Sequence, residues 1–342
     1  MQPGCLSARG DGRVIASAGA ALLLAAAISG CGGQGAGSSA VNAGTLKPAS
    51  GTGTSGCGHQ ESSGSLQYTL TANGHRRTVI VHIPPGYTGK SKLALVLNMH
   101  GSGSTASAEE QFSGMDATAD ADHFIVVYPQ ALISYSVGYN WNIPDEPMVN
   151  GKFPPPSAPS DVTFLTTLVR ELEGRYCIDP SRVYATGVSG GGRMADQLAC
   201  DASSVFAAIA PVAGLRYPSP CPASRPVPVI AFHGTADYID PFDGHGMGYW
   251  TYSVPTAAHY WATHNHCAAK SQNTSGHGYR LYRYTGCSGG AQVELYAITG
   301  EGHEWPGGPK MPSSITSALG PQSDAVSANA LMWAFFQAHP LS

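Results

Sequence analysis

The sequence predicts one α/β domain with a mostly parallel central sheet and helices on both faces. Three observations lead to this prediction. Short apolar segments of strand length alternate with helical patterns along most of the chain. The 342 residues, of which 42% are hydrophobic, can bury a large core. Finally, a glycine-rich turn around Ser189 joins a strand pattern to a helix pattern, as expected where an open sheet carries its active site.

The N-terminal residues predict export. Two arginines precede an apolar run at 14–28, which suits a signal peptide but is too short to hold a mature protein across a bilayer. Residues 27–31 read Ala-Ile-Ser-Gly-Cys and resemble a bacterial lipobox. We therefore expect residues 1–30 to be a lipoprotein-type signal peptide and Cys31 to carry a lipid. The alternative is ordinary signal cleavage nearby, with Cys31 lost or left as a spare thiol.

The residues after the lipobox predict a spacer. Residues 31–56 are rich in Gly and Ser, as in flexible tethers. The stretch of 25 residues that follows Cys31 has an expected end-to-end distance of about 25 to 30 Å. The folded domain, expected at 57–342, would then stand clear of a membrane and face the periplasm or the outside, with full secretion as the alternative.

The elements of the domain follow in order. Asn73 and Gly74 form a hairpin signal between strands expected at 65–71 and 77–83. A helix begins after Ser160, because the next apolar side chains repeat at helical spacing: Leu165, Leu168, Val169 and Leu172. Buried strands are expected at 93–99, 124–128, 182–188, 206–212, 227–233 and 292–298, and a closing helix at 324–339. Two irregular stretches, 130–159 and 238–252, adjoin the strand ends and are candidates for a substrate groove.

Residues 187–191 read Gly-Val-Ser-Gly-Gly, the G-x-S-x-G pattern of a nucleophile elbow. A β-branched and aromatic strand precedes it, and residues 193–200 can continue as a helix. Such a turn strains the backbone and needs small neighbours, which the glycines supply. The pattern predicts Ser189 as the nucleophile of an α/β-hydrolase. The alternative is a glycine-rich turn that carries a serine by accident.

An acid and a histidine must follow this serine in chain order. Asp237 follows the apolar strand 227–233, and His303 lies in the loop after the strand 292–298. His303 would take the proton of Ser189, and the carboxylate would orient the imidazole. Asp240, three residues later in the same loop, is the rival acid. Each residue taken alone has an alternative interpretation: Asp237 as an acid in a surface turn, and His303 as a solvated loop histidine.

An oxyanion hole is expected in the loop after the strand 93–99, where the chain reads His-Gly-Ser-Gly from position 100. The candidates are the backbone N–H groups of Ser102 and Gly190, each contributing about 3 kcal/mol to transition-state stabilisation. We expect His100 to be a structural hydrogen-bonding residue rather than a second base. Trp141 and Trp305 are candidates for stacking on an aromatic acyl group or a sugar, with core packing as the alternative.

With these residues in place, the chain resembles the secreted serine esterases that include feruloyl and acetylxylan esterases of the first carbohydrate esterase family and polyhydroxybutyrate depolymerase-like proteins. The resemblance rests on motifs in order, at 68–87, 100–101, 126–129, 139–142, 161–165, 177–184, 187–191, 206–214, 233–237 and 302–308. It implies the α/β-hydrolase fold, an acyl-enzyme mechanism without cofactor or metal, and a triad of Ser189, Asp237 and His303. The chain departs from the family pattern at Gly190, Asp240 and Glu304.

Eight cysteines fit export. Cys5 lies in the signal and Cys31 is the proposed lipid site, which leaves an even number for disulfides in an oxidising compartment. Sequence does not fix the pairing, but short loops favour Cys200 with Cys221 and Cys267 with Cys287, which leaves Cys57 for Cys177. A metal site of His264, His266 and Cys267 is the alternative use, although its spacing matches no tetrahedral motif.

Composition narrows the function further. The net charge is −4 and only 12% of the residues are charged, so no basic patch indicates a nucleic-acid partner. The sequence predicts an extracytoplasmic carboxylic ester hydrolase acting on acyl, feruloyl or acetyl esters of polysaccharides or on small phenolic esters. A polyhydroxyalkanoate depolymerase is the alternative. An alternative from another functional class is a catalytically silent cell-wall or glycan-binding lipoprotein on the same scaffold.

Overall fold

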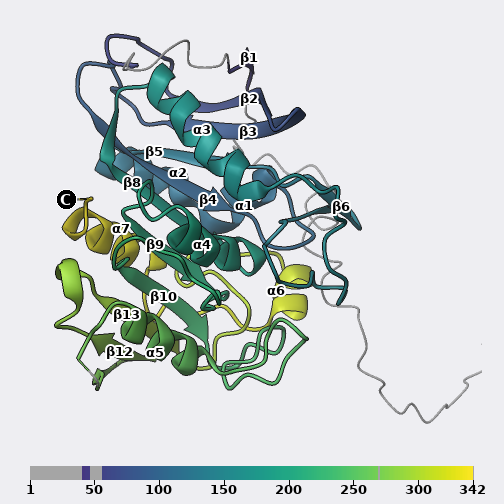
Figure 1. Ribbon diagram of the computed structural model, residues 1–342, viewed down its shortest axis with the longest axis vertical. Helices are drawn as coiled ribbons and strands as arrows, with labels where there is room; N and C mark the ends of the chain where they lie inside the picture. Colours follow the sequence, from purple (N-terminus) through teal and green to yellow (C-terminus); the bar gives the residue numbers. More distant parts are fainter. Residues whose placement is uncertain (1–40, 47–55, 269, 342) are drawn as a thin grey trace, which may run out of the picture.

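The computed structural model describes residues 41–46, 56–268 and 270–341, and a single large sheet runs through them (Figure 1). The middle of this sheet is parallel, as predicted. In spatial order its central strands are β5 (Ile125–Pro129), β4 (Leu93–Met99), β8 (Ile178–Val188), β9 (Ala208–Val212), β10 (Val229–Gly234) and β13 (Val293–Ile298). Because parallel strands end at one edge, the loops that follow them gather there.

Antiparallel strands complete both sides of the sheet. On one side, β2 (Gly64–Ala72) and β3 (His75–Ile83) form a hairpin whose turn residues Asn73 and Gly74 both have positive φ, at 50° and 74°. This confirms the hairpin that the Asn-Gly signal predicts. On the other side, β12 (Tyr279–Tyr284) and β11 (Gln272–Gly276) extend β13.

Helices cover both faces of the sheet, as predicted (Figure 1). One face carries α3 (Asp161–Arg175), α4 (Gly190–Asp201) and α5 (Val254–His264). The other carries α1 (Ala106–Ser113), α2 (Met115–Asp122), α6 (Ser313–Leu319) and α7 (Ala328–Ala338). Residues 190–200 of α4 are all buried, so this helix lies at the centre of its layer. The chain also forms a small hairpin of β6 (Ile133–Tyr135) and β7 (Gly138–Asn140) and a short 3-10 turn, Ser288–Gly290.

The start of α3 fixes the first irregular stretch to the core. Ser160 caps the helix by accepting the N–H of Thr163, as predicted. The next residue, Asp161, is buried in an ion pair with Arg77 of β3 and also accepts the backbone N–H of Asn142 at 2.8 Å. One carboxylate therefore joins a strand, a helix and the loop that runs toward the active edge.

Three disulfides pair as the loop lengths favoured. They join Cys57 to Cys177, Cys200 to Cys221 and Cys267 to Cys287. The first links the beginning of the domain to the residue just before β8. The third occupies the thiol of Cys267, which removes the cysteine on which the alternative metal site depended. Disulfides of this kind form in oxidising compartments and therefore fit an exported protein.

The structure corrects part of the predicted tether. Within 31–56, residues Val41–Thr45 form strand β1, which pairs in parallel with β2. Leu46 is buried and donates its N–H to the Thr69 carbonyl at 2.7 Å. The open edge of β2 offers unpaired backbone groups and an apolar surface, which this short segment covers. The closing helix also begins later than expected, at Ala328, after the cap residue Ser327.

The predicted signal peptide at 1–30 and the proposed lipid site Cys31 lie outside the described residues. Among the helices of the described ranges, none combines the length and the apolar character needed to cross a bilayer.

Candidate active site

Ser189 stands on a strained turn between β8 and α4. Its backbone has φ 54° and ψ −117°, a region that residues other than glycine rarely occupy. The close approach of β4 explains the flanking glycines: a Cβ at Gly187 or Gly191 would lie 2.3 or 1.9 Å from the Met99 carbonyl oxygen. The strand therefore touches the turn on both sides of Ser189. This is the geometry that a nucleophile elbow requires.

An acid and a histidine meet at the same edge of the sheet. Asp237 follows β10 and His303 follows β13, and these two strands are paired neighbours. His303 Nδ1 lies 2.7 Å from Asp237 Oδ2, and both side chains are buried. The imidazole is thereby held so that its other nitrogen, Nε2, is left for proton transfer.

The environment of Asp237 keeps it ionised. Its Oδ1 accepts the backbone N–H groups of Ile239 and Asp240, both at 2.9 Å, and His233 Nε2 lies 3.3 Å from its Oδ2. Burial raises the pKa of the Asp237 carboxyl, but the charge of His303 and the imidazole hydrogen bonds outweigh it, so the pKa falls well below its usual value.

The pKa of His303 shifts in the opposite direction to that of Asp237. Burial lowers the pKa of the His303 imidazole, but the neighbouring carboxylates, above all Asp237, raise it above its ordinary value. A stronger base results, which suits a group that must remove a hydroxyl proton. Glu304, the next residue, is also buried, and burial raises the pKa of its carboxyl to about 7.

The geometry distinguishes the two candidate acids. Asp237 reaches His303, whereas Asp240 uses its N–H to bond Asp237 and its carbonyl oxygen to accept His233 Nε2 at 2.8 Å. Burial raises the pKa of the Asp240 carboxyl, which faces Tyr249 and Arg193 as well as His303. Sequence reasoning did not single out His233, although its place four residues before the acid, at the end of the same strand, is a usable signal.

The predicted oxyanion loop is braced by the β6–β7 hairpin. Gly103 donates to the Tyr139 carbonyl at 2.9 Å, and Tyr139 donates back to the Ser104 carbonyl at 3.0 Å. Gly138 must lack a side chain, because a Cβ there would lie 2.2 Å from the Gly103 carbonyl oxygen. The first irregular stretch therefore fixes this loop against β7.

His100 fixes the start of this loop through hydrogen bonds. It is fully buried, its Nδ1 donates to the Gly101 carbonyl at 2.8 Å, and its Nε2 accepts the N–H of Ala131 at 3.2 Å. Burial lowers the pKa of the His100 imidazole to about 4, so the ring is neutral near pH 7. These contacts agree with a structural role and leave it no part as a second base.

Ser102 and Gly190, whose amides are expected in the oxyanion hole, lie next to each other. A Cβ built on Gly190 would lie 3.1 Å from the Ser102 nitrogen and 2.4 Å from its hydroxyl oxygen. Gly190 is also the first residue of α4, where an N–H has no acceptor within the helix. The hydroxyl of Ser102 occupies the space that a side chain at position 190 would need, which accounts for that departure from the family pattern.

Neither predicted stacking tryptophan presents a free face to substrate. Trp305 is fully buried, and its indole N–H bonds Asn329 at 2.9 Å. Trp141 is 3% exposed and donates to the His100 carbonyl at 2.7 Å. The structure therefore corrects this expectation in favour of core packing. Trp141 acts on the site indirectly, because it holds the residue from which the oxyanion loop starts.

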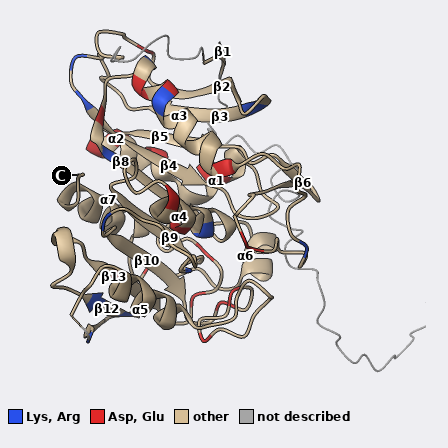
Figure 2. Cartoon of the chain, in the orientation of Figure 1, with Lys and Arg blue, Asp and Glu red and all other residues tan. Residues whose placement is uncertain are grey.

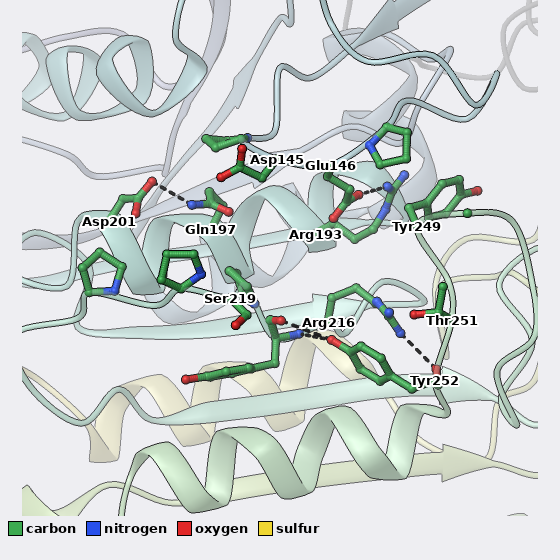
Figure 3. A pocket seen from close by; sticks show the side chains of 17 residues that line it. Asp145, Glu146, Arg193, Gln197, Asp201, Arg216, Ser219, Tyr249, Thr251 and Tyr252 are labelled. Carbon is green, nitrogen blue, oxygen red and sulfur yellow. Dashed lines mark hydrogen bonds and ion pairs between the residues drawn. The ribbon is translucent and has the colours of Figure 1, made fainter.

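Arg193 is a site residue that the sequence did not reveal. It lies one helical turn after Ser189 and is fully buried. Its guanidinium is ion-paired with Glu146 and lies 4.0 Å over the ring of Tyr249 (Figure 3). It also donates to the Ser102 hydroxyl at 3.4 Å. The only sequence signal was an arginine about one helical turn after the predicted nucleophile. This one side chain joins the elbow helix to the oxyanion loop and to both irregular stretches.

Comparison with known proteins agrees with this geometry. Residues 78–240, which include Ser189, Asp237 and Asp240, match the family model described as esterase PHB depolymerase. The match spans 163 of the 342 residues, and over them the chain is similar to that family. The fold is also that of a solved acetyl xylan esterase from Aspergillus awamori, with a TM-score of 0.50 and 17% identity over 70% of this chain and 94% of that one.

Two curated relatives extend the match. Feruloyl esterase B from Piromyces equi is 31% identical over 240 residues, which are 66% of this chain and 42% of that protein. Poly(3-hydroxyalkanoate) depolymerase C from Paucimonas lemoignei is 33% identical over 138 residues, which are 40% of this chain and 31% of that protein. The chain thus spans less than half the length of either relative.

If Asp237 orients His303, Asp237→Asn should lower kcat for p-nitrophenyl acetate by roughly four orders of magnitude, as loss of the triad acid does elsewhere. Asp240→Asn is the matched control. It should reduce kcat far less and shift the acidic limb of the pH profile of kcat/KM to lower pH, because it removes a charge that raises the pKa of His303. A larger loss of kcat in Asp240→Asn would identify Asp240 as the acid.

If Arg193 acts through Ser102, the two side chains should be coupled. Arg193→Met is best made with Glu146→Gln, so that no buried carboxylate is left unpaired. We expect this double variant to lose roughly 10- to 100-fold in kcat, part of the cost of losing one oxyanion donor. Adding Ser102→Ala should then cost little more. If the Ser102→Ala change lowers kcat by the same factor in the double variant as in the wild type, the two side chains are not coupled. The melting temperature of each variant is the control for folding.

Proposed function

We propose that this protein is a serine carboxylic ester hydrolase that works through an acyl-enzyme. The observation that carries the proposal is the buried His303–Asp237 contact of 2.7 Å at the same sheet edge as the strained Ser189. Such an arrangement serves nucleophilic catalysis and has no other evident use. The family match and the esterases among the relatives support it.

The proposed reaction has two halves. Ser189 Oγ attacks the ester carbonyl while His303 Nε2 takes its proton, and Asp237 stabilises the imidazolium. The carbonyl oxygen becomes an oxyanion that accepts the N–H groups of Ser102 and Gly190. His303 then gives the proton to the departing alcohol. Water repeats the sequence on the acyl-enzyme and releases the acid. The proposal calls for no metal and no cofactor.

For the substrate, we favour acyl, feruloyl or acetyl esters of polysaccharides, with small phenolic esters in the same group. The support comes from the relative that is a feruloyl esterase and from the acetyl xylan esterase that shares the fold. A nucleic-acid substrate finds no support, because Lys and Arg are scattered over the chain and do not gather on one element (Figure 2).

A polyester is the second candidate, and one observation favours it. Among the described residues, most of the exposed large hydrophobic side chains belong to the two irregular stretches at the active edge: Val137, Phe153, Tyr238 and Met247. An apolar rim would suit contact with a water-insoluble polymer. The similarity to a poly(3-hydroxyalkanoate) depolymerase points in the same direction.

For location, we propose export followed by lipidation of Cys31, with part of the segment before β2 as a tether. The lipobox-like residues 27–31 and the three disulfides support export. Lipid attachment would hold the enzyme beside its substrate at the cell surface. Release into the medium after ordinary signal cleavage is the alternative.

Ser189→Ala tests the function most directly. We expect it to abolish hydrolysis of p-nitrophenyl acetate and labelling by a fluorophosphonate probe while the melting temperature stays nearly unchanged, because only a hydroxyl is removed. The same assay on the wild type, with methyl ferulate, acetylated xylan and hydroxybutyrate oligomers, ranks the substrates. Residual labelling at another serine would refute the elbow assignment, and an unlabelled wild type would favour a silent glycan-binding protein.

Cys31→Ala tests the anchor. The variant should leave the membrane fraction with its specific activity intact, because the cysteine lies far before the catalytic residues in sequence. Fractionation followed by an activity assay on each fraction is the measurement, and Cys5→Ala is the matched control, expected to stay on the membrane. Continued membrane association of Cys31→Ala would show that the lipobox interpretation is wrong.

A further inference from the structure

A cleft lies beside Arg193, and none of the predicted site residues lines it. It has a volume of about 470 Å³, within the range of small-molecule sites. Its walls come from three segments, 144–147, 216–222 and 248–252, and α4 supplies the floor (Figure 3). Arg193 and Gln197 of that floor are buried, whereas Asp201, Ser219 and Thr251 at the mouth are exposed. The cleft is therefore open to a ligand that continues into solvent.

The charges of the lining argue against an anionic ligand. Three carboxylates line the cleft, from Asp145, Glu146 and Asp201, against two guanidinium groups. Both cations are engaged: Arg193 pairs with Glu146, and Arg216 donates to the Tyr252 carbonyl at 2.9 Å and lies 3.4 Å over the Tyr252 ring. Because the carboxylates outnumber the guanidinium groups, the lining does not favour a phosphate or a carboxylate.

The remaining lining groups are suited to hydroxyls. Gln197 of the floor donates to Asp201 at the mouth at 2.7 Å, which holds the amide and the carboxylate together in the lining (Figure 3). Hydroxyl groups of Ser219 and Thr251 and the rings of tyrosines and prolines complete the surface. Donors and acceptors mixed with flat apolar surface match a sugar, which has hydroxyls on its edges and C–H groups on its faces. A polyester segment has few donors and would leave these groups unpaired.

The cleft is connected to the reaction centre through one side chain. Arg193 forms part of its floor and also contacts Ser102 of the oxyanion loop. It belongs to α4, whose N-terminus carries Ser189. The floor of the cleft therefore begins at Arg193, about one helical turn after the nucleophile, and continues along α4 to Asp201. A large alcohol part of an ester that extends from Ser189 along α4 would enter the cleft at Arg193.

We propose that this cleft binds the carbohydrate portion of the substrate, the neutral, hydroxyl-rich alcohol from which the acyl group is removed. The proposal rests on the ester hydrolase function given above and specifies which part of the substrate this surface recognises. Small esters without a sugar do not use the cleft, so their hydrolysis is independent of it.

Gly248 offers a way to block the cleft selectively. It lines the cleft, and a Cβ there meets nothing within 4 Å. Gly248→Phe should therefore fold normally and fill the space, with Gly248→Ala as the size control. We expect kcat/KM for a feruloylated xylo-oligosaccharide to fall by at least roughly tenfold, the equivalent of one or two hydrogen bonds, while that for methyl ferulate stays within about twofold.

A second pair of variants guards against misfolding. Asp201→Ala removes an exposed cleft carboxylate, and Asp122→Ala removes an exposed carboxylate at the end of α2. Only the first should raise KM for the oligosaccharide, and melting temperatures monitor the fold. If Gly248→Phe lowers kcat/KM equally for both esters, or for neither, the cleft proposal is wrong. The ester hydrolase function would still stand in either case. A wild type that cleaves neither ester would overturn the proposed function, and this proposal with it.

Discussion

The carboxylate of Asp237 is the group on which the rest of the site depends. A charge in this buried position is tolerated only because two backbone N–H groups and two imidazoles surround it. The backbone donors come from its own turn, and His233 lies near the end of β10, the strand before it. His303 arrives from the neighbouring strand, so the parallel pairing of β10 with β13 sets the contact. The sheet therefore fixes the acid and the base before any substrate is bound.

A second buried charge organises the loops. Arg193 has three neighbours from different segments, Glu146, Tyr249 and Ser102, and each belongs to a stretch without long regular elements. Burying a guanidinium is costly unless it is paired, so loss of any one of these contacts would raise the free energy of the arrangement. The irregular stretches are thus held by these electrostatic contacts and hydrogen bonds together with buried apolar side chains such as Trp141 and Trp250.

The sequence predicted the parts that depend on local pattern. Apolar runs predicted the six central strands to within a few residues. The glycines around Ser189 indicated that another segment packs closely against the turn, and this segment is β4. What the sequence could not predict depends on contacts between distant residues. The partner of Arg193 lies 47 positions earlier, and nothing near Glu146 announces the pair. The prediction that Trp305 stacks on substrate was wrong for the same reason. Its nearness to His303 along the chain does not reveal that the indole points into the core toward Asn329.

The two candidate substrates make opposite demands on the surface around the site. A polyester gains from burying the exposed apolar side chains of the rim, such as Phe153 and Met247. It would, however, strip water from the carboxylates, amide and hydroxyls of the cleft without replacing their hydrogen bonds, at a cost of about 1 to 3 kcal/mol for each group left unpaired. A sugar can replace those bonds group by group. Because the cleft adjoins Arg193 and thus the oxyanion loop, the cleft should determine which large esters reach Ser189 in a reactive pose.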